Sequence, residues 1–374
     1  MTIASSSSCR CACSGQVARL PLREFTATDF RCLRAAELAA DPQFNLIHGA
    51  NASGKTSLLE AIAYLGRGKS FRGAPAQNLV RHGAREFLLL GRVDAGSRIA
   101  TVGVRNSREG LEVRIDGQGG GGAAALAAVL PLQVLDPEVH NLVSGGPDQR
   151  RRYLDWIAFH VEHGYLELWR RFRRALKQRN AALREDAGPA ELKGWDREFC
   201  ETGLSLHAAR ERVLVLARPA LEEMGAALLR SELGFEYQRG WVAERSLLAA
   251  LQGSLERDRQ LGSTQCGPQR ADLKLIYDER QASKLVSRGQ QKLLASTLIL
   301  AAVEVVQSAL EKPLLLLLDD PAAELDSDSL QRLMGSVVGL GCQVIATSLT
   351  PDRGLFPDAP ALFHVEQGAL KKQD

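Results

Sequence analysis

The chain has 374 residues, of which 45% are hydrophobic, and its formal net charge of +3 is nearly balanced. This length allows one large domain or two to three smaller ones, each with a packed core. The charge total does not indicate nucleic-acid binding, which must be inferred from local clusters. Because no segment approaches the ~20 consecutive apolar residues of a spanning helix, we exclude an integral membrane protein.

Residues 1–19 are predicted to form a disordered extension. They contain three cysteines at alternate positions, Cys9, Cys11 and Cys13. This spacing lacks the gap of two to four residues found between ligands in common zinc sites, so a disordered tail is favoured over a metal site. The chain has seven cysteines, an odd number, and they do not form a disulfide framework. A reducing, cytoplasmic location is therefore expected.

Residues 20–140 are predicted to begin an α/β nucleotide-binding domain. Within them, residues 49–56 match the phosphate-loop pattern Gly-x4-Gly-Lys-Ser/Thr, between an apolar stretch and a helical pattern. The backbone N–H groups of such a loop and of the following helix bind phosphates. We therefore expect ATP to bind to Gly49, Ala50, Asn51, Ala52, Ser53, Gly54, Lys55 and Thr56. Lys55 would reach the β- and γ-phosphates, and Thr56 would hold Mg²⁺.

Three short β-type runs follow the phosphate loop and predict an antiparallel meander: Leu88–Val93, Ile99–Val104 and Leu111–Ile115. Helical patterns then dominate from Asp148 to about Leu255. The predicted organisation is a nucleotide-binding lobe in two parts, 20–140 and 271–374, separated by a helical lobe at 141–270.

The helical segment carries the strongest basic clusters of the chain. Between Asp148 and Arg184 there are ten Arg or Lys residues and four acids. A solvated helix face explains such a run as well as DNA binding does. If DNA binds here, the contacts would be mostly to phosphates. The candidate residues are Arg150, Arg151, Arg152, Arg173 and Arg174.

Two features of the C-terminal part belong to the same site. The run Leu314–Leu318 is typical of a buried parallel strand, and it ends in Asp319 and Asp320. Ligands bind at the carboxyl ends of such strands, so Asp319 is expected to orient Mg²⁺ and Asp320 to accept a proton from the attacking water. Upstream, Ser287, Gly289 and Gln290 open a helix whose N-terminus could bind a further anion.

The order of phosphate loop, Ser-capped helix and apolar strand with two acids is similar to that of ATP-binding-cassette (ABC) ATPases. In that class the capped helix of one subunit covers the ATP held by the other. The resemblance also implies that Gln133 contacts the metal and the attacking water, and that Thr347 stands at the position of a switch residue.

More specifically, the chain resembles the RecF family of bacterial recombination and repair proteins, relatives of the chromosome-maintenance ATPase heads. The resemblance runs from about Leu20 to the C-terminus. Its most specific segments are Phe30-Arg31, 68–72, 145–156, 176–183, 267–272 and 287–292. Ala52 departs from the family pattern, which usually has glycine there, and would be strained if its φ is positive.

This resemblance implies a compact ABC-type head with an inserted helical lobe. It further implies an ATP-driven homodimer, slow DNA-stimulated ATP hydrolysis, binding to gapped DNA, and the partners RecO and RecR in loading a recombinase. Two alternatives remain open. One is the nucleotide-binding subunit of a membrane transporter, although Ser-Arg-Gly-Gln-Gln replaces the usual Leu-Ser-Gly-Gly-Gln. The other is a P-loop kinase or GTPase, although Asn-Lys-x-Asp is not found.

Overall fold

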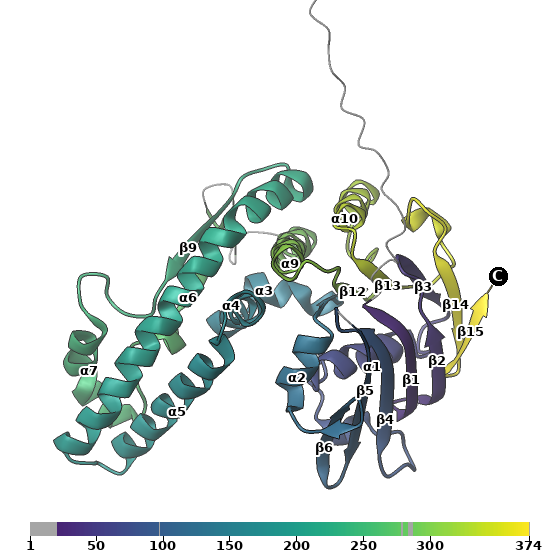
Figure 1. The fold of residues 1–374 in the computed structure, drawn as a ribbon. Helices are drawn as coiled ribbons and strands as arrows, with labels where there is room; N and C mark the ends of the chain where they lie inside the picture. Colours follow the sequence, from purple (N-terminus) through teal and green to yellow (C-terminus); the bar gives the residue numbers. More distant parts are fainter. Residues whose placement is uncertain (1–20, 97, 278–279, 283–286, 374) are drawn as a thin grey trace, which may run out of the picture.

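The computed structural model describes residues 21–96, 98–277, 280–282 and 287–373. The expected N-terminal extension lies outside these residues. Two six-stranded sheets occupy one end of the molecule and the helices α5, α6 and α7 the other, with α9 between them (Figure 1).

The first sheet is antiparallel, with the strand order β2-β1-β4-β5-β6-β7. Its strands alternate between buried and exposed residues, as expected for a sheet with one face on the core. This arrangement confirms the predicted meander, which corresponds to β4, β5 and β6. The strands are β1 (Leu22–Phe30), β2 (Leu33–Ala39), β4 (Phe87–Asp94), β5 (Ile99–Ser107), β6 (Gly110–Ile115) and β7 (Gln118–Gly119).

The second sheet has the order β15-β14-β3-β13-β12-β8, and all its neighbouring pairs except β14 and β15 are parallel. Its central strands are buried on both faces, which explains their continuous apolar sequences. The strands are β3 (Phe44–His48), β8 (Leu132–Leu135), β12 (Leu315–Leu318), β13 (Gln343–Ser348), β14 (Ala361–Glu366) and β15 (Ala369–Gln373).

Helix α1 (Lys55–Arg67) packs between the two sheets, and residues 58–66 are all buried. α2 (Gly122–Val129) lies beside α1. The opposite face of the parallel sheet packs against the long helix α9 (Arg288–Leu310), with α10 (Ser327–Gly339) next to it. Short helical segments occupy the connections: η1 (Ala76–Leu79), η2 (Pro137–His140), α3 (Asn141–Ser144), η3 (Pro268–Arg270) and η4 (Arg353–Leu355).

The insertion is mainly helical, as predicted, but it includes a small antiparallel sheet of order β11-β10-β9. The expected boundary at residue 270 would separate β10 from β9, with which it pairs, so β10 and β11 lie with the insertion. Its elements are α4 (Pro147–Val161), α5 (Tyr165–Arg184), α6 (Pro189–Leu229), β9 (Leu233–Gln238), α7 (Leu247–Leu261), β10 (Asp272–Tyr277) and β11 (Arg280–Gln281).

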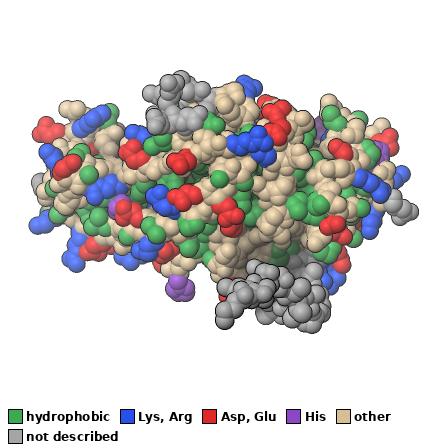
Figure 2. Space-filling view, turned by 90° about the horizontal axis from the view of Figure 1, so that it is seen from above, with side chains coloured by type: hydrophobic (Ala, Val, Ile, Leu, Met, Phe, Trp, Pro, Cys, Tyr) green, Lys and Arg blue, Asp and Glu red, His purple; other side chains and the backbone are tan. Residues whose placement is uncertain are grey.

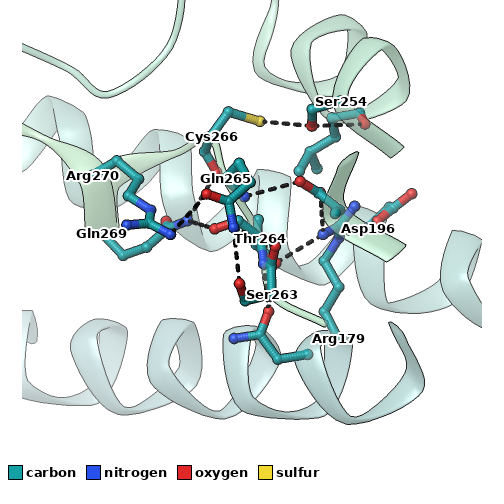
Figure 3. A network of polar contacts seen from close by, with 12 residues as sticks. Arg179, Asp196, Ser254, Ser263, Thr264, Gln265, Cys266, Gln269 and Arg270 are labelled. Carbon is teal, nitrogen blue, oxygen red and sulfur yellow. Dashed lines mark hydrogen bonds and ion pairs between the residues drawn. The ribbon is translucent and has the colours of Figure 1, made fainter. Parts of the chain in front are cut away.

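A buried arginine ties the helices of the insertion together. Arg179 on α5 is 0% exposed, and it ion-pairs with Asp196 on α6 and Asp258 on α7 at 2.7 and 2.8 Å (Figure 3). It also donates to Thr264 Oγ1 at 2.8 Å. Removal of one partner from such a pair leaves an uncompensated buried charge. We therefore assign this network to the stability of the inserted helices.

Within the described residues, α9 is the one helix long and apolar enough to cross a membrane. However, 67% of its apolar stretch is buried inside the protein, against the parallel sheet and the inserted helices. This burial is typical of a core helix, which is apolar on every side because it has protein on every side.

Candidate functional site

The phosphate loop joins β3 to α1 and depends on glycine at its first position. Gly49 has φ 156°, and a Cβ there would lie 2.4 Å from the backbone oxygen of Val365 on β14. Ala52 adopts φ 62°, so the left-handed conformation that makes glycine usual in the family is present here with alanine. This costs roughly 1 kcal/mol of backbone strain. The expectation that Ala52 would be strained is therefore confirmed.

The inner face of the loop suits a phosphate group. Lys55 Nζ folds over the loop and donates to the carbonyl oxygens of Gly49 and Ala50 at 2.7 and 2.9 Å. Burial lowers the pKa of Lys55, and the charges of Asp320 and Asp319 oppose this shift. The hydroxyl of Ser53 is buried without a hydrogen-bond partner among the described residues. A phosphate oxygen would accept from both groups.

Asp319 lies at the meeting point of three segments. Its Oδ1 accepts hydrogen bonds from Thr56 Oγ1 at 3.0 Å and from Thr347 Oγ1 at 2.8 Å. Burial raises the pKa of the Asp319 carboxyl, whereas the two hydroxyl hydrogen bonds lower it. Because β12 and β13 are parallel neighbours, their carboxyl ends bring Asp319 and Thr347 together at one edge of the sheet.

Asp320 continues from Asp319 with a left-handed backbone, φ 48°. Its backbone N–H donates to Thr347 Oγ1 at 2.9 Å. The Thr347 hydroxyl thus bridges the two acids, since it donates to one and accepts from the next residue. The structure therefore brings together Lys55, Thr56, Asp319, Asp320 and Thr347 as the sequence predicted.

Gln133 does not join this group. It lies inside β8 and pairs with Leu316 of β12, which is three residues before Asp319. It is 6% exposed, and its Oε1 accepts from Arg67 at 3.0 Å. In this structure the Gln133 side chain contacts Arg67, and its expected contact with the metal and the attacking water stays a prediction. The strand continues two residues past Gln133, so Asp136 is the polar residue that follows its end.

The same rule that selected Asp319, a carboxylate directly after an apolar strand, would have found Asp136. Burial raises the pKa of Asp136 to about 6, with the charge of Asp319 as the next cause, while Arg67 lowers it. The folded protein therefore disfavours ionised Asp136. Its charge lowers the free energy of unfolding above pH 6, and this effect disappears below the unfolded pKa.

The variant Asp136→Asn is expected to stabilise the nucleotide-free protein. The pKa shift corresponds to roughly 2–3 kcal/mol in the free energy of unfolding at pH 8, and the gain should shrink as the pH falls toward 5. Urea unfolding at pH 8 and pH 5.5 measures this difference. A variant that is less stable than the parent at pH 8 would contradict the electrostatic assignment.

The start of α9 forms a closed capping box. Ser287 Oγ accepts from the backbone N–H of Gln290 at 3.3 Å, and Gln290 Oε1 accepts from the backbone N–H of Ser287 at 3.0 Å. Both residues are exposed, and Gly289 is half-buried. The predicted capped helix is present, and its N-terminus faces solvent, as a surface that covers a second molecule requires.

The five candidate DNA contacts have different environments. Arg150 is buried, forms a bidentate ion pair with Asp272 at 2.7 and 3.1 Å, and donates to carbonyl oxygens at the end of α3. The prediction that Arg150 binds DNA is therefore wrong, because its donors are used inside the protein. Arg151 is half-buried and donates to Ala271 O at 2.7 Å. The exposed members are Arg152, Arg173 and Arg174.

A contribution from the C-terminal hairpin was not anticipated. The turn between β14 and β15 donates from Gly368 N to Ser53 O at 2.9 Å. A Cβ at Gly368 would lie 2.4 Å from the backbone oxygen of Cys32, so there is no space for a side chain. The hairpin thus supports the phosphate loop from outside. Gly368 itself was the available signal in the sequence, but its partner Ser53 is more than three hundred residues away.

Comparisons with known proteins agree with this geometry. Residues 21–370 match the family described as RecF/RecN/SMC N terminal domain. The DNA replication and repair protein RecF of Chromohalobacter salexigens is 41% identical over 361 residues, which cover 94% of this chain and 99% of that protein. The chain belongs to the RecF family. This membership places it among the DNA replication and repair proteins with an ABC-type ATPase head.

Solved structures confirm the fold of the RecF family for this chain. The recombination mediator protein RecF-ATPrS of the RecFOR pathway superposes with a TM-score of 0.84 at 25% identity and covers 96% of this chain and 100% of that one. An Smc head bound to the C-winged helix domain of ScpA has a TM-score of 0.57 at 16% identity, with 94% and 97% covered, and shows the fold alone. The transporter and kinase interpretations are not supported.

Proposed function

We propose that this RecF-family protein is an ATP-driven dimer that binds DNA at single-strand gaps and, with RecO and RecR, helps to load a recombinase in the cytoplasm. The observation that carries the proposal is the shared hydrogen bonding of Thr56 and Thr347 to one Asp319 oxygen beside Lys55. Its relative RecF-ATPrS, a recombination mediator of the RecFOR pathway, supports the choice of nucleotide and pathway.

The residues of the phosphate loop suit ATP with Mg²⁺. Thr56 Oγ1 and Asp319 Oδ1 lie 3.0 Å apart and are the hard oxygen donors that Mg²⁺ prefers, usually together with water and phosphate oxygens. When bound, the ion would neutralise phosphate charge. Lys55 would bind the β- and γ-phosphates, and Asp320 would accept the proton of the attacking water. We expect slow turnover, which suits a timing switch.

The exposed capping box supports a head-to-tail dimer. In this arrangement Ser287, Gly289 and Gln290 of each protomer cover the ATP held by the other. The interface is isologous, so one symmetry axis completes both sites. A helix of 23 residues carries a partial positive charge at its N-terminus, which favours a γ-phosphate at that position. Hydrolysis would remove that contact and release the dimer.

The proposed DNA contacts are the exposed arginines of the insertion, Arg152 on α4 and Arg173 and Arg174 on α5. Arg173 lies over the ring of Trp169, with its guanidinium carbon 5.3 Å from the ring centre. Acidic and basic side chains are mixed over the face seen in Figure 2. Because the formal net charge is only +3, binding would depend on local phosphate contacts and not on a large basic field.

Alanine at Arg152, Arg173 and Arg174 together should weaken DNA binding and reduce its salt dependence. Each lost phosphate contact lowers the slope of log K against log salt by about 0.9, so a combined loss of about 2–3 is expected. Fluorescence anisotropy at several salt concentrations measures the slope. The charge-matched control is alanine at three other exposed arginines: Arg92 and Arg114 on the antiparallel sheet, and Arg98 in the connection between β4 and β5. Equal slopes in the two triple variants would contradict the assignment.

Sedimentation velocity with ATP, ADP and gapped DNA tests the proposed function as a whole. We expect a monomer with ADP, a dimer with ATP, and faster sedimentation of the dimer with gapped DNA. The variant Lys55→Ala removes the ammonium that faces the phosphates and should remain monomeric in all three conditions. A wild-type protein that binds ATP, stays monomeric and binds DNA equally with either nucleotide would refute the proposal.

A further inference from the structure

Lys292 on α9 is a buried lysine to which the ATP chemistry described above gives no role. It is 3% exposed. Its Nζ donates to the backbone oxygens of Ala323 at 2.5 Å, Pro321 at 3.3 Å and Asp320 at 3.4 Å. An ammonium group has three N–H donors, so one is available for each carbonyl. Lysine is almost never buried to this extent unless its donors are satisfied.

The three acceptors belong to one strained turn, residues 320–324, between β12 and α10. Asp320 has φ 48° and Glu324 has φ 65°, and such left-handed conformations are unfavourable for residues with a Cβ. Carbonyl dipoles that converge on one point repel one another unless a cation lies between them. Lys292 is that cation, and it therefore stabilises the shape of the turn and the direction of the Asp320 side chain.

The start of α9, which covers the partner's nucleotide in the proposed dimer, lies on the same face of the helix as Lys292. Gly289 lies one turn before Lys292, and a Cβ there would be 3.1 Å from the backbone oxygen of Glu324. Arg288 is 4.0 Å from the carboxylate of Glu324. These three positions of α9, spaced by three and four residues, all contact the turn. The helix start and the turn are thus packed as one unit.

We propose that Lys292 is a positioning residue that couples the two ATP sites of the dimer. The inference rests on the proposed function, in which Ser287 and Gly289 face the ATP of the partner while Asp320 faces the ATP of its own protomer. Lys292 joins these two groups within one chain. A γ-phosphate that fixes the start of α9 in one site therefore fixes the direction of Asp320 in the other.

The variant Lys292→Met tests this role, because it keeps the length of the side chain and removes every donor. ATP affinity of the monomer should stay within about threefold of wild type, since the phosphate loop is unchanged. The kcat for ATP should fall by about 10²-fold, the effect of a catalytic group displaced by 1 Å. The Hill coefficient for ATP should fall from above one to one. Lys193→Met, exposed on α6, is the charge-matched control and should retain both values.

Three results would overturn the inference. The first is a Met variant with wild-type kcat and cooperativity. The second is a variant in which melting temperature, ATP affinity and kcat all decrease together, because that pattern shows a structural role alone.

If the Met variant does not fold, the variant Lys292→Gln, which retains two N–H donors, is used to test the inference. Its expected kcat is intermediate at unchanged ATP affinity, and wild-type cooperativity is the third contrary result. A wild-type protein without ATPase activity would refute the proposed function first.

Discussion

Asp320→Asn is expected to bind ATP and to accumulate as a dimer that does not dissociate. The substitution removes the carboxylate that would accept the proton of the attacking water, a loss worth about 10²–10⁴ in rate. The backbone is not disturbed, because the hydrogen bond to Thr347 comes from the main-chain N–H of Asp320. Asparagine also tolerates the left-handed conformation at φ 48° better than other residues with a Cβ. Phosphate release measures the rate, and size-exclusion chromatography measures the trapped dimer.

The neighbouring substitution Asp319→Asn separates the two acids. It removes the negative charge of the carboxylate that accepts from Thr56 and Thr347, and it should weaken Mg²⁺-dependent ATP binding itself. The two variants are thus expected to fail at different steps, one at hydrolysis and the other at binding. If Asp320→Asn hydrolyses ATP within about threefold of the wild-type rate, Asp320 is not the general base, and Asp136 becomes the next candidate for that role.

Much of this site was predictable because it depends on local patterns. A glycine-rich loop between an apolar strand and a helix, and two acids after the run Leu314–Leu318, each define a strand end. Parallel strands then bring these ends to one edge. The positive φ of Ala52 was predictable for the same reason, since the geometry of the loop is set by its own few residues.

The local sequence was a poorer guide where the position of a side chain depends on a distant partner. Arg150, Arg151 and Arg152 are consecutive on a helix, so their side chains point in directions about 100° apart and have different environments. Arg150 faces inward because Asp272, 122 residues later, lies there. Gln133 lies inside the four-residue strand β8 and not at its carboxyl end, and there it accepts a hydrogen bond from Arg67. Neither partner is indicated by the local sequence.

Ser287→Arg is expected to bind ATP as a monomer and to lose ATP-dependent dimerisation. Ser287 is exposed at the N-terminus of α9, so a large side chain there does not disturb the phosphate loop of the same protomer. In the proposed dimer it would occupy the space of the partner's γ-phosphate. Loss of the capping box itself costs about 1 kcal/mol of stability, which is too little to unfold the protein.

Ser246→Arg provides the matched control for this variant. Ser246 is also an exposed N-cap, of α7, and its side chain accepts from the backbone N–H of Ala249. The control loses the same kind of cap and gains the same charge, but it lies in the insertion, far from α9 in sequence. It should still dimerise with ATP in sedimentation velocity. If Ser287→Arg dimerises as the control does, the helix start does not cover the nucleotide of a second protomer, and each site must be complete within one chain.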